Sequence, residues 1–100
     1  MTDRELLELA AKAGGIVLEC YHDDKLGFEK YDGDCWNPLG DDGDAFRLAV
    51  ELGIGMCHHI EWSQVFNPQT GVTDFNHDGN ALAATRRAIV QAAAKIGKHK

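Results

Sequence analysis

The feature that most constrains this chain is a change of hydrophobic period along its 100 residues. Apolar residues recur at helical spacing near both ends and in the middle, and they alternate at a period of two in the stretches between. Helical spacing is typical of an amphipathic helix, and strict alternation is typical of a half-buried strand. The chain is therefore predicted to alternate between helices and pairs of strands.

The first helix is predicted to begin at Thr2 and to end at the Gly14-Gly15 pair. Thr2 and Glu5 fit the S/T-x-x-E capping box, in which two backbone N–H groups at the helix start are satisfied reciprocally. Glycine suits the left-handed position that closes many helices. The apolar face is then expected to consist of Leu6, Leu9, Ala10 and Ala13.

The second helix is predicted to follow the Asp41 cap and to end at Gly53, because Asn37-Pro38 disfavours helix just before it. Its buried stripe is expected to be Ala45, Phe46, Ala49, Val50 and Leu52. The third helix is predicted over residues 80–96, ending before Gly97. Its buried stripe is expected to be Leu82, Ile89, Ala93 and Ile96.

Strands are predicted between these helices, with turns at residues 23–25 and 67–71. The predicted strands cover residues 15–22, 27–31, 55–66 and 72–75. The element order is then α-β-β-α-β-β-α. This order predicts a sandwich-like α+β fold in which three helices pack on a mainly antiparallel four-stranded sheet. We expect residues 1–100 to form a single domain, since domains of this size are common.

Composition narrows the cellular setting. The chain has three cysteines, Cys20, Cys35 and Cys57, an odd number without CxxC spacing. This argues against a disulfide framework and for a reducing compartment. The N-terminus is amphipathic and acidic, so no signal peptide is predicted. No segment approaches the roughly 18 apolar residues that span a bilayer. We expect a cytoplasmic protein that does not bind membranes.

Charge is spread unevenly along the chain. The net charge is −6, and residues 23–44 alone hold eight acids against two lysines, which is 2 − 8 = −6. From Arg86 onward the chain carries five basic residues and no acid. Arg86, Arg87, Asp41 and Asp42 are therefore candidates for contact with a partner protein or with a second copy. A generally acidic protein is a poor ligand for nucleic acid, so binding through the last helix is a further alternative only.

One candidate metal site follows the last predicted strand. Asp74, Asn76 and Asp78, followed by Gly79, fit the D-x-[DN]-x-[DN]-G opening of a calcium loop. The twelfth position, where a bidentate Glu closes such a loop, is Thr85. A polar turn that leads from the strand into the Asn80 cap explains the same residues.

A second candidate metal site lies on the long predicted strand. Cys57, His59 and Glu61 alternate there and would share one face, and all three side chains can bind zinc. Cys20 or His22 could add a fourth ligand if their strand were adjacent. A polar solvent-facing side of an amphipathic strand explains the same pattern.

Sequence motifs give an enzyme little support. The chain holds no GxSxG, HExxH or phosphate-binding glycine loop. Cys57 and His58 are neighbours on a predicted strand and so point to opposite faces, which prevents them from acting as nucleophile and base. We expect no catalytic residues and no cofactor beyond a calcium or zinc ion at one of the two candidate sites.

Three blocks of the sequence resemble small phage and prophage proteins. Residues 36–45 read WNPLGDDGDA and lead into FRLAV, which resembles the segment before the central helix of those proteins. Residues 84–90, with the alanines at 92–94, and the opening at residues 2–13 are similar to them too. The group is the phage ABA-sandwich-like family of uncharacterised proteins. The resemblance implies an α/β sandwich and a bacterial cytoplasm as location, and it supplies no catalytic residues.

The function expected from these features is that of a phage or prophage accessory protein that binds another protein without catalysis. The alternative is a small metal-binding protein or a metal-dependent hydrolase. The WNP segment is expected to build the scaffold, with the Trp36 ring buried, Pro38 setting a turn and the aspartates starting the helix.

Overall fold

The computed structural model describes residues 1–23, 25–30 and 33–100. Within them the helices are α1 (Asp3–Gly14), α2 (Asp42–Leu52) and α3 (Ala81–Lys98). The strands are β1 (Leu18–Asp23), β2 (Gly27–Lys30), β3 (Cys35–Trp36), β4 (Gly55–His58), β5 (Trp62–Asn67) and β6 (Gly71–Asn76). The α+β class and the three helices predicted from the sequence are confirmed.

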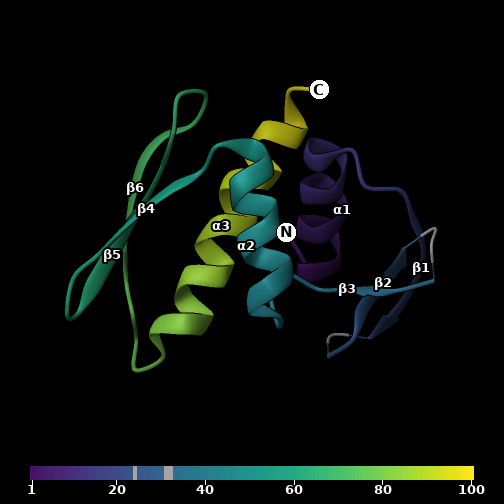
Figure 1. Cartoon of the computed structure of the whole chain (residues 1–100), viewed down its shortest axis with the longest axis horizontal. Coiled ribbons are helices and arrows are strands. Elements are labelled where there is room, and N and C mark those ends of the chain that lie inside the picture. The colour runs from purple at the N-terminus through teal and green to yellow at the C-terminus, as the bar shows by residue number, and fades with distance from the viewer. Residues whose placement is uncertain (24, 31–32) are drawn as a thin grey trace.

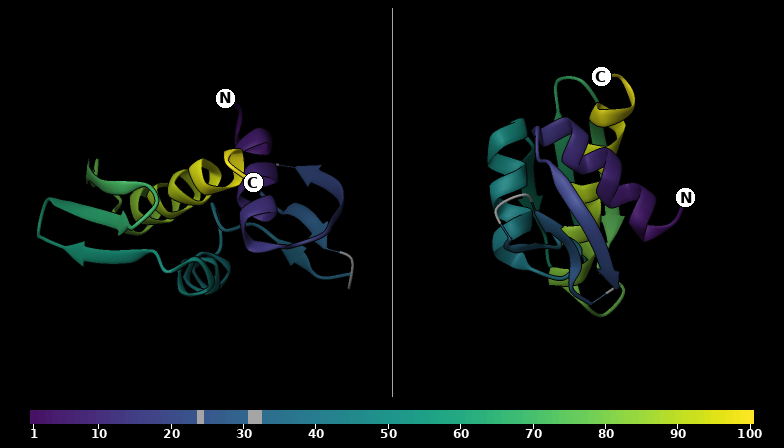
Figure 2. Two further views of the ribbon diagram at one scale, coloured as in Figure 1. Left: turned by 90° about the horizontal axis from the view of Figure 1, so that it is seen from above. Right: turned by 90° about the vertical axis from the view of Figure 1, so that its right-hand side faces the viewer.

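The strands form two antiparallel sheets, β1-β2-β3 and β4-β5-β6, which we call sheet A and sheet B. Figure 1 and Figure 2 show the helices as a middle layer, with sheet A on one side and sheet B on the other. The prediction of one four-stranded sheet with the order α-β-β-α-β-β-α is therefore wrong. The observed order is α-β-β-β-α-β-β-β-α.

Two local features hid the additional strands. Residues 55–66, predicted as one strand, belong to β4 and β5, which a tight turn joins; there the His59 N–H donates to the Trp62 carbonyl at 2.9 Å. Residues 59–62 contain none of the Gly, Pro, Asn or Asp that usually mark a turn. β3 has only two residues, which is too short for alternation to be visible.

The first predicted hairpin is found as β1 and β2. Two of its predicted positions lie outside the described residues: residue 24 in the turn and residue 31 at the end of the second strand. The second predicted hairpin, around the turn at residues 67–71, is found as β5 and β6.

The predicted helix caps are confirmed. At the start of α1, the Thr2 hydroxyl accepts from the Glu5 N–H at 3.2 Å, and the Glu5 side chain completes the capping box. Asp41 caps α2 by accepting from the Asp44 N–H at 2.8 Å. Gly53 closes α2 in the left-handed conformation at φ 67°. These ends are set by short-range chemistry, which is why the sequence located them.

The C-terminal end of α3 differs from the prediction. The helix continues through Gly97 to Lys98 instead of ending at Ile96. A Cβ at position 97 would overlap the backbone carbonyl of Leu9 in α1, so the glycine allows the two helices to approach closely. Here glycine serves packing, and the sequence alone does not distinguish that role from a helix stop.

The core lies where the helices meet each other and the inner faces of the sheets. Small residues dominate the buried positions of α1 and α3, where the buried alanines are Ala10, Ala11, Ala13, Ala88, Ala92, Ala93 and Ala94. Sheet A contributes Phe28 and Trp36, which are paired across β2 and β3 and are both buried. Sheet B contributes Val65. Among the described residues, none of the helices combines the length and apolar character required to cross a membrane.

The predicted buried stripes are wrong at three large residues. In α2, Phe46 and Val50 are exposed, whereas Leu48, outside the predicted stripe, is buried. In α3, Leu82 is exposed, whereas Ile89, Ala93 and Ile96 are buried as predicted. Helical spacing reports which side chains share a face, but it does not report whether this chain itself covers that face.

Candidate functional site

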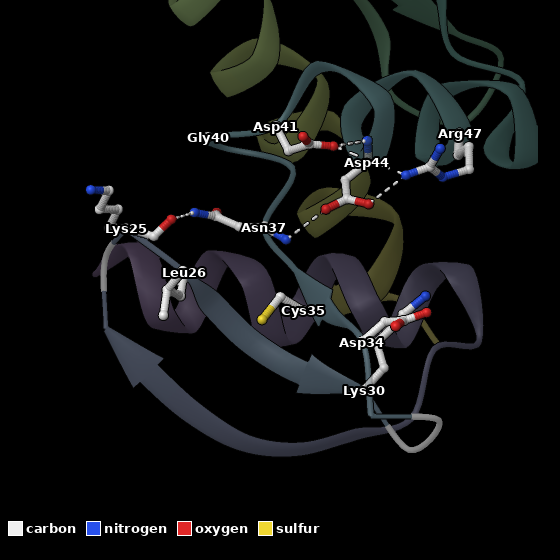
Figure 3. A pocket seen from close by; sticks show the side chains of 10 residues that line it. All are labelled: Lys25, Leu26, Lys30, Asp34, Cys35, Asn37, Gly40, Asp41, Asp44 and Arg47. Atoms are coloured by element: carbon white, nitrogen blue, oxygen red, sulfur yellow. Dashed lines mark hydrogen bonds and ion pairs between the residues drawn. The ribbon is translucent and has the colours of Figure 1, made fainter.

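The WNP segment forms a polar junction between sheet A and the start of α2 (Figure 3). The backbone N–H of Asn37 donates to Asp44 Oδ2 at 2.9 Å, and the Asn37 side-chain amide donates to the Lys25 carbonyl at 3.0 Å. Asp44 is buried, and its Oδ1 accepts from the Arg47 guanidinium at 2.7 Å. One carboxylate and one amide therefore join the β1–β2 turn, the segment after β3 and α2.

This junction builds the scaffold. Trp36 is only 3% exposed, and the Asp44 carboxylate already accepts hydrogen bonds from within the chain. The adjoining pocket of ≈ 520 Å³ is lined by both acids and bases, among them Lys25, Asp41 and Arg47. The expectation that the WNP segment is structural agrees with these contacts.

A larger apolar groove lies on the other side of α2. Its volume is ≈ 630 Å³, and its walls come from α2, from the β4–β5 hairpin and from the N-terminal half of α3. Met56 and Ile89 are among its more buried lining residues. The volume falls in the range of about 300–1,000 Å³ that is usual for ligand-binding pockets.

Three large apolar side chains stand around this groove with much of their surface in solvent. Phe46 of α2 is 61% exposed, Leu82 of α3 is 63% exposed, and Ile60 at the tip of the β4–β5 hairpin is 96% exposed. Single exposed apolar residues are ordinary on a protein surface. Three of them around one apolar groove form a patch, and such patches mark interaction sites.

Charged residues at the groove are paired within the chain. Arg86 donates to Asp42 Oδ1 at 2.6 Å and to the Leu39 carbonyl at 2.9 Å, so α3 is tied to the start of α2. Arg87 points elsewhere and donates to Asp3 of α1 at 3.0 Å. Of the four predicted partner-contact residues, Asp42 and Arg86 line the groove, Asp41 caps α2 and lines the other pocket, and Arg87 joins two helices.

A serine and two histidines lie beside the groove. The Ser63 hydroxyl on β5 is 2.9 Å from His58 Nδ1 and 2.7 Å from His77 Nε2. Serine next to histidine is the arrangement that activates a nucleophile. Ser63 is 0% exposed, however, so its hydroxyl cannot meet a substrate in the groove. The three side chains instead connect β4, β5 and the segment after β6.

The structure brings together only part of the predicted Cys57, His59 and Glu61 site. Cys57 Sγ lies 3.8 Å from His59 Nε2, and the His59 ring stacks on Trp62 with ring centroids 4.1 Å apart. Glu61 lies in the turn after β4, because the long strand that would have aligned it is broken there. β1, which carries Cys20 and His22, belongs to sheet A, so neither residue can complete a site on sheet B.

The predicted calcium ligands are strung along an extended segment. Asp74 and Asn76 lie on β6, two residues and therefore about 6.7 Å apart along the strand. Asp74 Oδ1 accepts from the Gln64 side-chain amide at 2.9 Å, and Asp78 occupies a turn with φ 52°. A calcium loop curves its ligands around the ion, whereas this strand spreads them out. Calcium binding at these residues stays a prediction.

Comparisons with protein-family models, with curated proteins and with solved structures find no match to this chain. The resemblance of the WNP segment to phage proteins therefore stays a hypothesis. Sequence reasoning missed the groove, although it had singled out two of its anchors, Phe46 and Leu82, as members of apolar stripes. Nothing in the sequence indicated the groove wall formed by the β4–β5 hairpin, because residues 55–66 read as one continuous strand.

Proposed function

We propose that this chain is a non-catalytic binding module that takes an apolar segment of a partner protein into the groove between α2, α3 and sheet B. One observation carries the proposal: Phe46, Ile60 and Leu82 come from three separate elements, surround one groove and remain largely exposed. Burying them against a partner removes apolar surface from water, which is the main driving force of association.

Phe46, Ile60 and Leu82, the three anchors of the proposed interface, supply a substantial part of the free energy of binding. Full burial of a large apolar side chain is worth about 1.5–3 kcal/mol, and the three anchors keep most of that gain available. Their joint contribution of about 4–6 kcal/mol is partly offset by the loss of translational freedom and by side-chain ordering. Further apolar contact with the groove wall is therefore needed to reach a micromolar dissociation constant, which corresponds to about −8 kcal/mol.

The apolar lining of the groove also indicates what kind of partner segment would bind there. An amphipathic helix that lays one apolar face into a groove is a recurring mode of recognition, with anchors spaced at i, i+3 or i+4, and i+7. We propose such a segment, in a phage or host protein, as the occupant. The proposal gives the chain the role of an accessory protein, in keeping with the phage-like WNP segment.

In this proposal, charged side chains contribute less to partner binding than the uneven charge distribution of the sequence suggested. Arg86 pairs with Asp42 and Arg87 pairs with Asp3, so the basic residues nearest the groove already have acidic partners. Association driven by apolar contact should then persist at high ionic strength, where exposed charges are screened. A charge-driven association, or binding of nucleic acid through Arg86 and Arg87, would weaken as salt is added.

The experiment is selection of binders from a displayed library of random helical peptides, followed by affinity measurement on the soluble peptides. We expect selected peptides to carry apolar residues at helical spacing. Phe46→Gln and Leu82→Gln should each weaken their binding by about tenfold or more, since each removes a buried anchor worth about 1.4 kcal/mol or more. Raising the salt from about 0.05 to about 0.5 M should change the affinity by less than about threefold.

Val72→Gln provides the matched control, because Val72 is a large apolar residue with 66% exposure on β6 and does not line the groove. Its affinity for the peptides should equal that of the unmodified protein. Peptides that bind Phe46→Gln and Leu82→Gln as tightly as the unmodified protein would refute the proposal. The proposal would also be refuted if the affinity fell by much more than about threefold over the same range of salt concentration.

A further inference from the structure

The outer face of sheet A gathers three side chains of different chemistry. Cys20 on β1 is directly opposite Glu29 on β2, and His22 follows two residues after Cys20. The Cys20 thiol donates to Glu29 Oε2 at 3.4 Å, and His22 Nε2 lies 3.4 Å from the same oxygen. The pairing register shifts on both sides of Cys20 and Tyr21, and such bulges re-aim side chains.

The three donor atoms already stand close to the spacing of a metal coordination shell. All of them lie within 4.8 Å of one another. In tetrahedral zinc sites the metal is about 2.3 Å from sulfur and about 2.0–2.1 Å from nitrogen or oxygen, so neighbouring ligand atoms are about 3.3–3.6 Å apart. The two contacts to Glu29, at 3.4 Å each, match that spacing, and the ligand atoms of Cys20 and His22 are no more than 4.8 Å apart.

We propose that Cys20, His22 and Glu29 form a zinc-binding site on the outer face of sheet A. Thiolate and imidazole donors together favour zinc over calcium or magnesium, which take oxygen ligands. The side chains of His22 and Glu29 are 40% and 37% exposed, so an ion reaches them directly from solvent. Three protein ligands leave the fourth tetrahedral position to water.

The electrostatics of the site are compatible with a cation. The hydrogen bond to Glu29 is the main cause that raises the pKa of the Cys20 thiol, followed by desolvation and by the charges of Glu29, Glu19 and Cys35. Negative charge therefore surrounds the sulfur. When zinc binds, Cys20 coordinates as the thiolate and its proton passes to solvent.

This site is independent of the groove proposed above, since it lies on the other sheet. It also differs from both metal sites predicted from the sequence, because its residues come from β1 and β2. Among the described residues, Cys20, His22 and Glu29 are the only group of three His, Cys, Asp or Glu side chains whose ligand atoms lie close enough together to hold one metal ion.

The test is titration of the reduced, chelator-treated full chain with Zn²⁺, and with Co²⁺ as a spectroscopic probe of the same site. We expect one ion per chain and a thiolate-to-cobalt charge-transfer band. Cys20→Ser should abolish the band. His22→Ala and Glu29→Gln should each weaken Zn²⁺ binding by at least about tenfold, as the loss of even a supporting group does in known metal sites.

Matched controls separate this site from adventitious binding to exposed thiols. Cys57→Ser removes an exposed cysteine on sheet B and should leave the stoichiometry and the band unchanged. Glu19→Gln removes a neighbouring charge without removing a ligand, and should weaken binding by less than about threefold. Circular dichroism verifies that each variant is folded.

Two results would overturn the inference. The first is a charge-transfer band that survives Cys20→Ser or that disappears with Cys57→Ser. The second is a stoichiometry of half an ion per chain, which would mean that two molecules share the metal through their exposed thiols.

Discussion

Helix α3 meets its neighbours in two different ways. Toward α1 the approach is close, since Gly97 allows the two backbones to meet at Leu9, and most buried residues of α3 are alanine or glycine. Toward α2 and sheet B, its N-terminal half instead presents Leu82, Thr85 and Arg86 to a groove. We call these the closed face and the open face of α3.

The difference between the faces shows how one helix can serve both folding and recognition. Small residues let helices approach until dispersion contacts fill the interface, as in any close-packed protein interior. Large apolar residues that stay exposed in the folded chain can still gain free energy when a binding partner covers them. Substitutions on the closed face should therefore change stability, and those on the open face should change binding.

On the closed face, the largest stability effect is expected at the point where α1 and α3 approach most closely. Gly97→Ala places a methyl group against the Leu9 carbonyl, and neither backbone can move without displacing its helix. We expect a loss of at least about 2 kcal/mol in the free energy of unfolding, even though alanine is the better helix former by up to about 1 kcal/mol. Urea denaturation measures this loss.

Gly43→Ala in α2 is the matched control for that substitution. A methyl group at position 43 would meet only the side chains of Arg47 and Asp41, which can move. Its free energy of unfolding should be unchanged or raised by up to about 1 kcal/mol. If Gly97→Ala is as stable as Gly43→Ala, the closed face is less tightly packed than described.

A smaller loss is expected where α2 is fixed to sheet A. Asp44→Ala removes the acceptor of the buried Asn37 N–H, so we expect a loss of about 2 kcal/mol in the free energy of unfolding. The Arg47 contact adds little to this, because Arg47 is 68% exposed and solvent screens the pair. Thermal or urea unfolding measures the change.

Asp41→Ala gives the comparison, because it removes a helix cap at an exposed position. Its expected cost is about 1 kcal/mol. Equal losses for Asp41→Ala and Asp44→Ala would contradict the view that the WNP segment joins α2 to sheet A through the buried carboxylate. The difference between them measures the junction separately from the cap.

Features set by neighbouring residues could be predicted from the sequence. The Thr2 capping box, the Asp41 cap and the Gly53 end each depend on a few consecutive residues, and all three are found. The hairpin turn at residues 59–62 lacks turn residues, and the apolar alternation gives no sign of the break. Together with the missed two-residue strand β3, this missed turn gave the wrong sheet arrangement, and it separated Glu61 from the strand face to which it was assigned.

The candidate sites depend on pairing between strands, which spacing along the chain does not report. Cys20 and His22 were recognised as possible ligands, and their strand was correctly paired with the strand that carries Glu29. Placing Glu29 opposite Cys20 required the pairing register, which the bulges in β1 shift. The groove required a different kind of information, namely which apolar stripe the chain itself leaves uncovered.

The smallest stability effect is expected around the groove that the open face of α3 and α2 line together. Phe46→Gln and Leu82→Gln should each change the free energy of unfolding by less than about 0.5 kcal/mol, because both side chains are mostly in solvent in the folded chain. Leu48→Ala, two residues after Phe46 on the same helix, removes a buried side chain and should cost about 2–5 kcal/mol. Urea denaturation of the three variants compares them directly. A loss at Phe46 as large as that at Leu48 would mean that the groove belongs to the folding core, and the distinction between the two faces of α3 would then fail.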